Sequence, residues 1–99
     1  MKTIKKNKKL PLTQAALRRK AINAGVKFIA EQTVFISEDT KFGKNVVIEP
    51  YVVIASKVSV GNNVTIKSFS HLEGSNIGNN VVIGPYARLR PGTKINNDV

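Results

Sequence analysis

A six-residue spacing of large apolar side chains constrains this fold more than any other feature of the sequence. Seven such residues follow one another at this spacing without a break: Ile36, Phe42, Ile48, Ile54, Val60, Ile66 and Leu72. The series then shortens by one residue and resumes, again every six, at Ile77, Ile83, Leu89 and Ile95. A helix repeats near 3.6 residues and a strand near 2, so neither element alone explains the spacing.

The residues around these apolar positions indicate a short strand followed by a turn. A small or β-branched residue stands two positions earlier in most units, as at Val46, Val52 and Val64. Glycines and asparagine pairs recur just after the apolar position, and both residue types tolerate the positive φ angles of turns. A unit this short cannot bury its apolar side alone, whereas stacked units can. The sequence therefore predicts an all-β parallel solenoid, with a shortened corner at 74–76.

The pattern resembles that of hexapeptide-repeat proteins. This resemblance implies a left-handed parallel β-helix in which three hexads complete one triangular coil of about 18 residues. Residues 34–99 would then supply about three and a half coils of a partial β-helix, about 15 to 20 Å tall at the spacing of neighbouring strands.

The first thirty residues differ in kind from the rest. They carry nine Lys and Arg and no acid, whereas residues 31–99 carry seven bases and six acids, so nine of the ten net positive charges belong to the N-terminal part. We expect a disordered basic arm at 1–11, a short helix at 12–25 between an N-cap Thr13 and a terminating Gly25, and a connector at 26–33. The first 27 residues contain no aromatic residue. This composition favours a solvated tail over a nucleic-acid or membrane-binding arm.

Composition excludes several classes of function. The chain has no Cys and one His, which excludes disulfides, thiolate zinc sites, a cysteine nucleophile and multi-histidine metal centres. No stretch of the sequence is apolar over the roughly 18 residues that a membrane span needs. We therefore expect a cytoplasmic protein without a metal or cofactor of its own.

Longer motifs narrow the resemblance from about Leu12 to the end of the chain. They are the basic helix and turn at 18–26, TVFIS at 33–37, IEPYVVI at 48–54, SHLEG at 70–74 and IGPYARLRPGT at 83–93. Together they are similar to the bifunctional bacterial enzymes that are both UDP-N-acetylglucosamine pyrophosphorylases and glucosamine-1-phosphate N-acetyltransferases. The product of that family serves peptidoglycan and lipopolysaccharide synthesis.

The resemblance implies a place for this chain within the family architecture. There, a linker helix joins a magnesium-dependent nucleotidyltransferase domain to a β-helix that trimerises and transfers an acetyl group from acetyl-CoA. This chain would span the seam, with both complete active sites outside it. We expect a truncated or split fragment without catalysis of its own.

Arg90 is the one residue that the resemblance assigns to a site, as a contact to the phosphorylated amino sugar. A guanidinium can grip a phosphate bidentately, although a solvated Arg on an outer face explains the position equally well and a single cation binds phosphate weakly. His71 is not expected to be a catalytic base, because it precedes Leu72 and should point outward. Glu49, Glu73 and Tyr86 are candidates for polar site residues, but solvated turn positions explain them at least as well, and no residue is assigned to catalysis, cofactor or metal.

Four interpretations remain open at this stage. The chain could be an inactive fragment, a trimeric binding or scaffolding module that displays basic arms, a subunit completed by a separately encoded acetyltransferase remainder, or an enzyme that keeps residual acetyltransferase activity. A homotrimer or a completing chain would cover the apolar residues of the last hexads.

Overall fold

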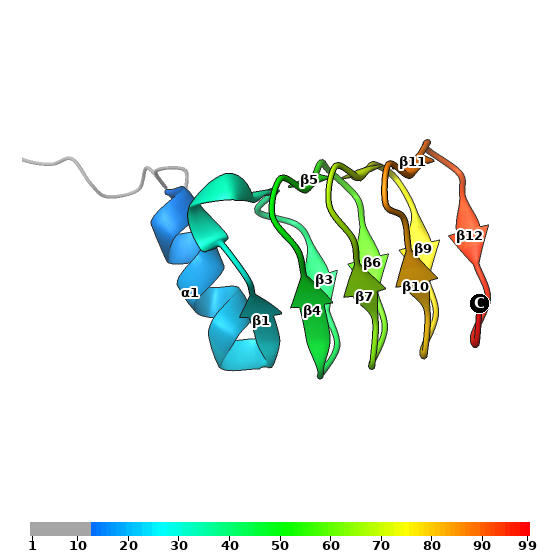
Figure 1. The fold of residues 1–99 in the computed structure, drawn as a ribbon, viewed down its shortest axis with the longest axis horizontal. Helices are drawn as coiled ribbons and strands as arrows, with labels where there is room; N and C mark the ends of the chain where they lie inside the picture. The colour runs from blue at the N-terminus through cyan, green and yellow to red at the C-terminus, as the bar shows by residue number, and fades with distance from the viewer. Residues whose placement is uncertain (1–12) are drawn as a thin grey trace, which may run out of the picture.

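The computed structural model describes residues 13–99; the arm predicted at 1–11 lies outside these described residues. They form one helix and a solenoid of about four coils, which stack along the long axis of the molecule with the helix at one end (Figure 1). The helical elements are α1 (Gln14–Ala24) and the 3-10 turn η1 (Glu31–Thr33). The strands are β1 (Val26–Phe28), β2 (Phe35–Ile36), β3 (Lys41–Phe42), β4 (Val46–Ile48), β5 (Val53–Ile54), β6 (Ser59–Val60), β7 (Thr65–Ile66), β8 (His71–Leu72), β9 (Asn76–Ile77), β10 (Val82–Ile83), β11 (Arg88–Leu89) and β12 (Lys94–Ile95).

Each coil gives one strand to each of three parallel sheets. Within residues 13–99 the first sheet has the order β1-β4-β7-β10, the second β11-β8-β5-β2 and the third β12-β9-β6-β3. Val53 pairs with His71, eighteen positions later, but His71 pairs with Arg88 after only seventeen. The loss of one residue confirms the predicted shortened corner. It lies between β8 and β9, where Gly74 has a φ of 53°. This architecture is consistent with the left-handed β-helix of hexapeptide-repeat proteins and confirms the predicted fold class.

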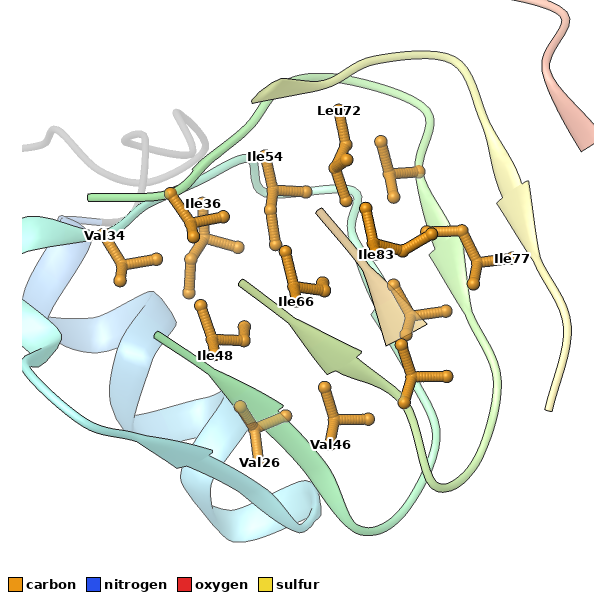
Figure 2. Packing of buried hydrophobic residues seen from close by; sticks show 14 of the residues in the cluster. Val26, Val34, Ile36, Val46, Ile48, Ile54, Ile66, Leu72, Ile77 and Ile83 are labelled. Carbon is orange, nitrogen blue, oxygen red and sulfur yellow. The ribbon is translucent and has the colours of Figure 1, made fainter. Parts of the chain in front are cut away.

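The six-residue apolar positions form the core, as predicted. Ile48, Ile54, Ile66 and Leu72 have no exposed surface and point into the interior of the coil (Figure 2). The smaller residues two positions earlier are buried beside them, for example Val64. Burying each such side chain is worth about 1.5 to 3 kcal/mol, which is how units too short to fold alone stabilise one another. In the last coil, Ala87, Leu89 and Ile95 are only partly buried.

Helix α1 covers one end of this core with Leu17 and Ala21, which are buried. The predicted caps are confirmed: the Thr13 side chain accepts a hydrogen bond from the backbone N–H of Ala16, and Gly25 closes the helix with a φ of 113°. Side chains of the helix also satisfy backbone groups of the first coil. The Arg18 guanidinium donates to the carbonyl of Val34 from Nε at 3.2 Å and Nη2 at 2.9 Å.

Residues 26–33, where the sequence indicates a connector, contain the first strand of the solenoid. β1 pairs with β4, and Phe28 lies opposite Ile48, twenty positions later. This coil is two residues longer than the regular eighteen, and η1 lies within it. The longer coil removes the six-residue spacing before Ile36, which is why the pattern gives no sign of β1.

The corner between the third and first sheets is held by two columns of amide side chains, which we call the amide corner. Asn45 donates through Nδ2 to Asn63 at 3.1 Å, and Asn63 donates to Asn80 at 3.0 Å. In the second column the backbone N–H of Asn62 donates to Oδ1 of Asn79 at 2.8 Å. The other rungs join Lys44 to Asn62, Asn79 to Asn97 and Asn80 to Asp98.

Glycine at this corner serves a purpose other than the positive φ that the sequence suggests. Asn45, Asn63 and Asn80 have φ angles near 58°, as expected, but Gly61 does not have a positive φ. A Cβ at Gly61 would lie 2.6 Å from the carbonyl oxygen of Gly78 and against the Asn79 side chain. Glycine is therefore required because the neighbouring coil approaches too closely for any side chain.

Candidate functional site

Arg90 follows β11 at the corner between the second and third sheets. Its backbone carbonyl accepts hydrogen bonds from the N–H of Thr93 at 3.0 Å and from the Thr93 hydroxyl at 2.7 Å. Gly92, with a φ of 93°, completes this tight turn. The Arg90 side chain is exposed, so the turn presents a guanidinium to solvent.

The strand register places Glu73 one coil before Arg90 at the same corner, because Leu89 pairs with Leu72. Further along the same edge, Asp39 accepts from the Ser37 hydroxyl at 2.7 Å and from the backbone N–H of Lys57 at 3.1 Å. These hydrogen bonds, the hydroxyl first, hold the pKa of Asp39 below its ordinary value of 3.8. The carboxylate therefore stabilises the fold above that pH, and the contribution is lost as the pH falls through the lowered pKa.

His71 points outward on the second sheet, as its place before Leu72 predicts. Its neighbours in the outward column are Val53 on one side and Arg88 on the other. The imidazole is exposed. A general base acts on a proton within hydrogen-bond reach in a positioned substrate, and an open strand face offers no such positioning.

The other polar candidates divide into structural and exposed residues. The Glu49 carboxylate is partly buried and accepts from the backbone N–H of Ser68 at 3.2 Å and from its hydroxyl at 3.4 Å, so it joins two coils. Glu73 is partly buried, whereas Tyr86 is 74% exposed. The structure brings Arg90 and Glu73 to one corner and leaves Glu49 and Tyr86 at a different one.

A column of stacked rings stands at the corner between the first and second sheets, which we call the aromatic corner. Tyr51 and Phe69 stack with ring centroids 5.5 Å apart and an interplanar angle of 6°. Phe69 and Tyr86 stack at 5.2 Å and 8°. All three are more than half exposed, and the sequence analysis missed their relationship. Their spacings of eighteen and seventeen residues, one coil each, were the signal.

The described residues do not fit the magnesium ion that the family resemblance implies for the full-length enzymes. Within residues 13–99 no three His, Asp or Glu side chains come together in a group that could hold a metal ion. Arg90 lies on an exposed turn. None of the helices in this part of the chain is long and apolar enough to cross a membrane.

Comparison with known proteins agrees with this geometry. Residues 39–74 match the family model described as bacterial transferase hexapeptide (six repeats). The chain therefore contains a hexapeptide-repeat domain over these residues. Its similarity extends beyond those residues, to curated relatives named bifunctional protein GlmU.

GlmU of Azorhizobium caulinodans is 48% identical over 88 residues, which cover 89% of this chain and 20% of the relative. GlmU of Zymomonas mobilis subsp. mobilis is 50% identical over 84 residues, covering 85% and 19%. GlmU of Rhodopseudomonas palustris is 56% identical over 59 residues, covering 60% and 13%. The family resemblance predicted from the motifs is confirmed, and the chain spans about a fifth of the length of the first two relatives.

Proposed function

We propose that this hexapeptide-repeat chain is a non-catalytic assembly unit of a GlmU-like N-acetyltransferase, a truncated or split form of the enzyme that makes UDP-N-acetylglucosamine in the cytoplasm. The observation that carries this proposal is the 48% identity to GlmU of Azorhizobium caulinodans over 89% of the chain. Most of these residues form the stacked coils of the β-helix. His71 on an open strand face supports a structural rather than a catalytic role.

Arg90 is the residue through which such a unit contacts substrate. Its guanidinium is exposed on a turn fixed by two hydrogen bonds to the Arg90 carbonyl, from the Thr93 N–H and the Thr93 hydroxyl. A positioned guanidinium can bind two phosphate oxygens at once. Alone it contributes little affinity for the phosphate of an amino sugar, because a single exposed ion pair is worth about 1 kcal/mol or less.

The unit assembles as a homotrimer through the side of the solenoid formed by the aromatic corner and the second sheet. Phe35 and Val53 are neighbours on the outer face of that sheet and are 49% and 37% exposed. The stacked rings of Tyr51 and Phe69 adjoin them at 58% and 53% exposure. A contiguous exposed apolar surface of this kind is typical of a protein interface.

An acetyl-transfer assay tests the proposal. The purified chain is mixed with acetyl-CoA and glucosamine 1-phosphate, and released coenzyme A is measured with a thiol reagent, which the chain itself cannot consume because it has no Cys. We expect release at the rate of the protein-free control. Release that rises with protein concentration and falls in Arg90→Ala would overturn the non-catalytic assignment.

The last coil favours a second candidate, a subunit that is completed by further hexapeptide coils on another chain. Leu89 and Ile95 are only partly buried, whereas the residues with which they pair, Leu72 and Ile77, are buried. A further coil would cover them and continue the backbone pairing of β10, β11 and β12. In the same assay, activity that requires addition of a second hexapeptide chain supports this candidate over a free-standing trimer.

A further inference from the structure

A groove with a volume of about 320 Å³ lies between α1 and the first coil. Its apolar lining comes from Leu17, Ala21 and Ile36, which are buried, and from Phe42, which is partly exposed. The polar and small residues that line it are Lys20, Ala24, Ser37, Glu38, Thr40 and Lys41. The helix packs against β1 and β2, and the groove opens beside β3.

The backbone of Phe42 faces this groove. The N–H groups on either side of it, of Lys41 and Gly43, donate to Val58 and Val60 of the second coil at 3.1 and 2.8 Å. Because N–H groups alternate in direction along a strand, the N–H and C=O of Phe42 point the opposite way, toward the helix end. Within residues 13–99 no backbone or side-chain hydrogen bond is formed to them on that side.

The equivalent position in β2 indicates what would pair there. Ile36 stands six residues before Phe42, and its N–H donates to the side-chain oxygen Oε1 of Gln14 at 2.9 Å. The Gln14 Nε2 donates in turn to the Ile36 carbonyl at 2.8 Å. The Gln14 carboxamide therefore takes the place of a peptide group from a preceding coil, and β3 lacks such a group from the described part of the chain.

We propose that the groove binds an extended, acidic peptide segment of a partner protein, which adds a short strand beside β3. A peptide group of the segment pairs with the backbone of Phe42, and an apolar side chain enters the groove. Carboxylates on the segment meet Lys20 and Lys41, two ammonium groups that share the rim with the single carboxylate of Glu38. Backbone pairing at a sheet edge with pockets for alternate side chains is a common mode of peptide recognition.

The charge of the groove rim favours an acidic partner segment over the chain's own basic N-terminal residues. The first ten residues of the chain contain five Lys and no acid, so their own charge opposes that of the rim. An acidic segment meets the opposite charge at the same place. The proposal does not depend on acetyl transfer or on trimer formation, because α1 and β3 lie toward one end of the solenoid and β11, which Arg90 follows, lies toward the other (Figure 1).

The test is a titration of the full-length, isotope-labelled chain with the peptide acetyl-Glu-Val-Gln-Ile-Glu-amide, followed by NMR. We expect saturable shifts of the amides of Phe42 and Ala24 and slower hydrogen exchange at Phe42. A peptide that is N-methylated at its Gln should bind at least tenfold more weakly, because it loses the backbone donor. Absence of saturable shifts in this groove would overturn the proposal.

Charge variants of the protein provide the matched control. Lys41→Glu should weaken binding at least tenfold, whereas Lys94→Glu, on the outer face of the same sheet three coils away, should change it less than twofold. Both side chains are exposed, so both variants should keep the wild-type spectrum elsewhere. Equal binding by the two variants would contradict the charge assignment.

Two further results would identify another occupant and overturn the proposal. Phe42 shifts that depend on protein concentration without peptide would show that a second copy fills the groove. Stronger binding of acetyl-Lys-Val-Gln-Ile-Lys-amide than of the acidic peptide would show that the rim selects a basic segment such as the chain's own first ten residues.

Discussion

The amide corner and the aromatic corner solve the same backbone problem with opposite side chains. Each turn needs a residue with a φ near 60°, and one corner supplies Asn45, Asn63 and Asn80 while the other supplies Tyr51 and Phe69. Asparagine tolerates this conformation because its short side chain can hydrogen-bond locally, whereas bulky residues adopt it at a cost of about 1 to 2 kcal/mol. The aromatic residues are therefore not explained by the turn alone.

The two corners also differ in how completely their side chains are used within the chain. At the amide corner the carboxamides of successive coils bond to one another or to backbone N–H groups at 2.7 to 3.1 Å. At the aromatic corner the rings contact one another only by stacking of their faces, and more than half of each side chain stays exposed. The comparison indicates that the amide corner fixes the register of the coils, whereas the exposed rings of the aromatic corner are available to the proposed interface between copies.

The strongest way to break the amide corner is Gly61→Ala. The new Cβ would lie 2.6 Å from the carbonyl oxygen of Gly78, so backbone of two coils must move apart. Overpacking of this kind costs about 3 kcal/mol. Urea denaturation should show the loss, and Gly92→Ala is the steric control, since a Cβ there meets nothing within 4 Å although its φ of 93° adds strain. A smaller loss for Gly61→Ala than for Gly92→Ala would contradict the close-approach explanation.

Removing the middle ring tests the aromatic corner. Phe69→Ala abolishes both stacked pairs and should cost about 2 kcal/mol, because each aromatic pair contributes roughly 0.5 to 1.5 kcal/mol. Tyr86→Ala abolishes one pair and should cost about half as much. Equal losses of unfolding free energy in the two variants, measured by denaturation at low protein concentration, would mean that the rings do not act as a column.

A single rung of the amide corner should matter least. Asn79→Ala removes the acceptor for the backbone N–H of Asn62 and should cost about 1 kcal/mol, the usual net worth of one hydrogen bond. Asn76→Ala on the outer face of β9 is the matched control and should change the unfolding free energy by less than about 0.5 kcal/mol. The amide columns would lose their assigned role if both substitutions had the same effect.

The sequence predicts the repetitive part of this fold well because each hexad repeats one physical requirement. Ile48, Ile54 and Ile66 are buried by the same packing in successive coils, and the missing residue near Gly74 shifts the register without breaking it. The helix caps at Thr13 and Gly25 are local and equally predictable.

Features that depend on unlike segments meeting in space were not predictable in the same way. The Gln14 carboxamide reaches the backbone of Ile36, twenty-two residues away, through a contact that no periodicity encodes. β1 escapes notice because its coil is two residues longer than the others. The site assignment at Arg90 rests on family resemblance, and it stays a prediction.

The mass of the chain in solution tests the central claim most directly, that the aromatic corner and the second sheet form an interface between copies. Sedimentation equilibrium should give three times the chain mass of 10.8 kDa, at low and high salt alike. Phe69→Glu should shift the population to the monomer, because a charge would be buried in the interface. A wild-type chain that remains at 10.8 kDa over the whole accessible concentration range would contradict the account.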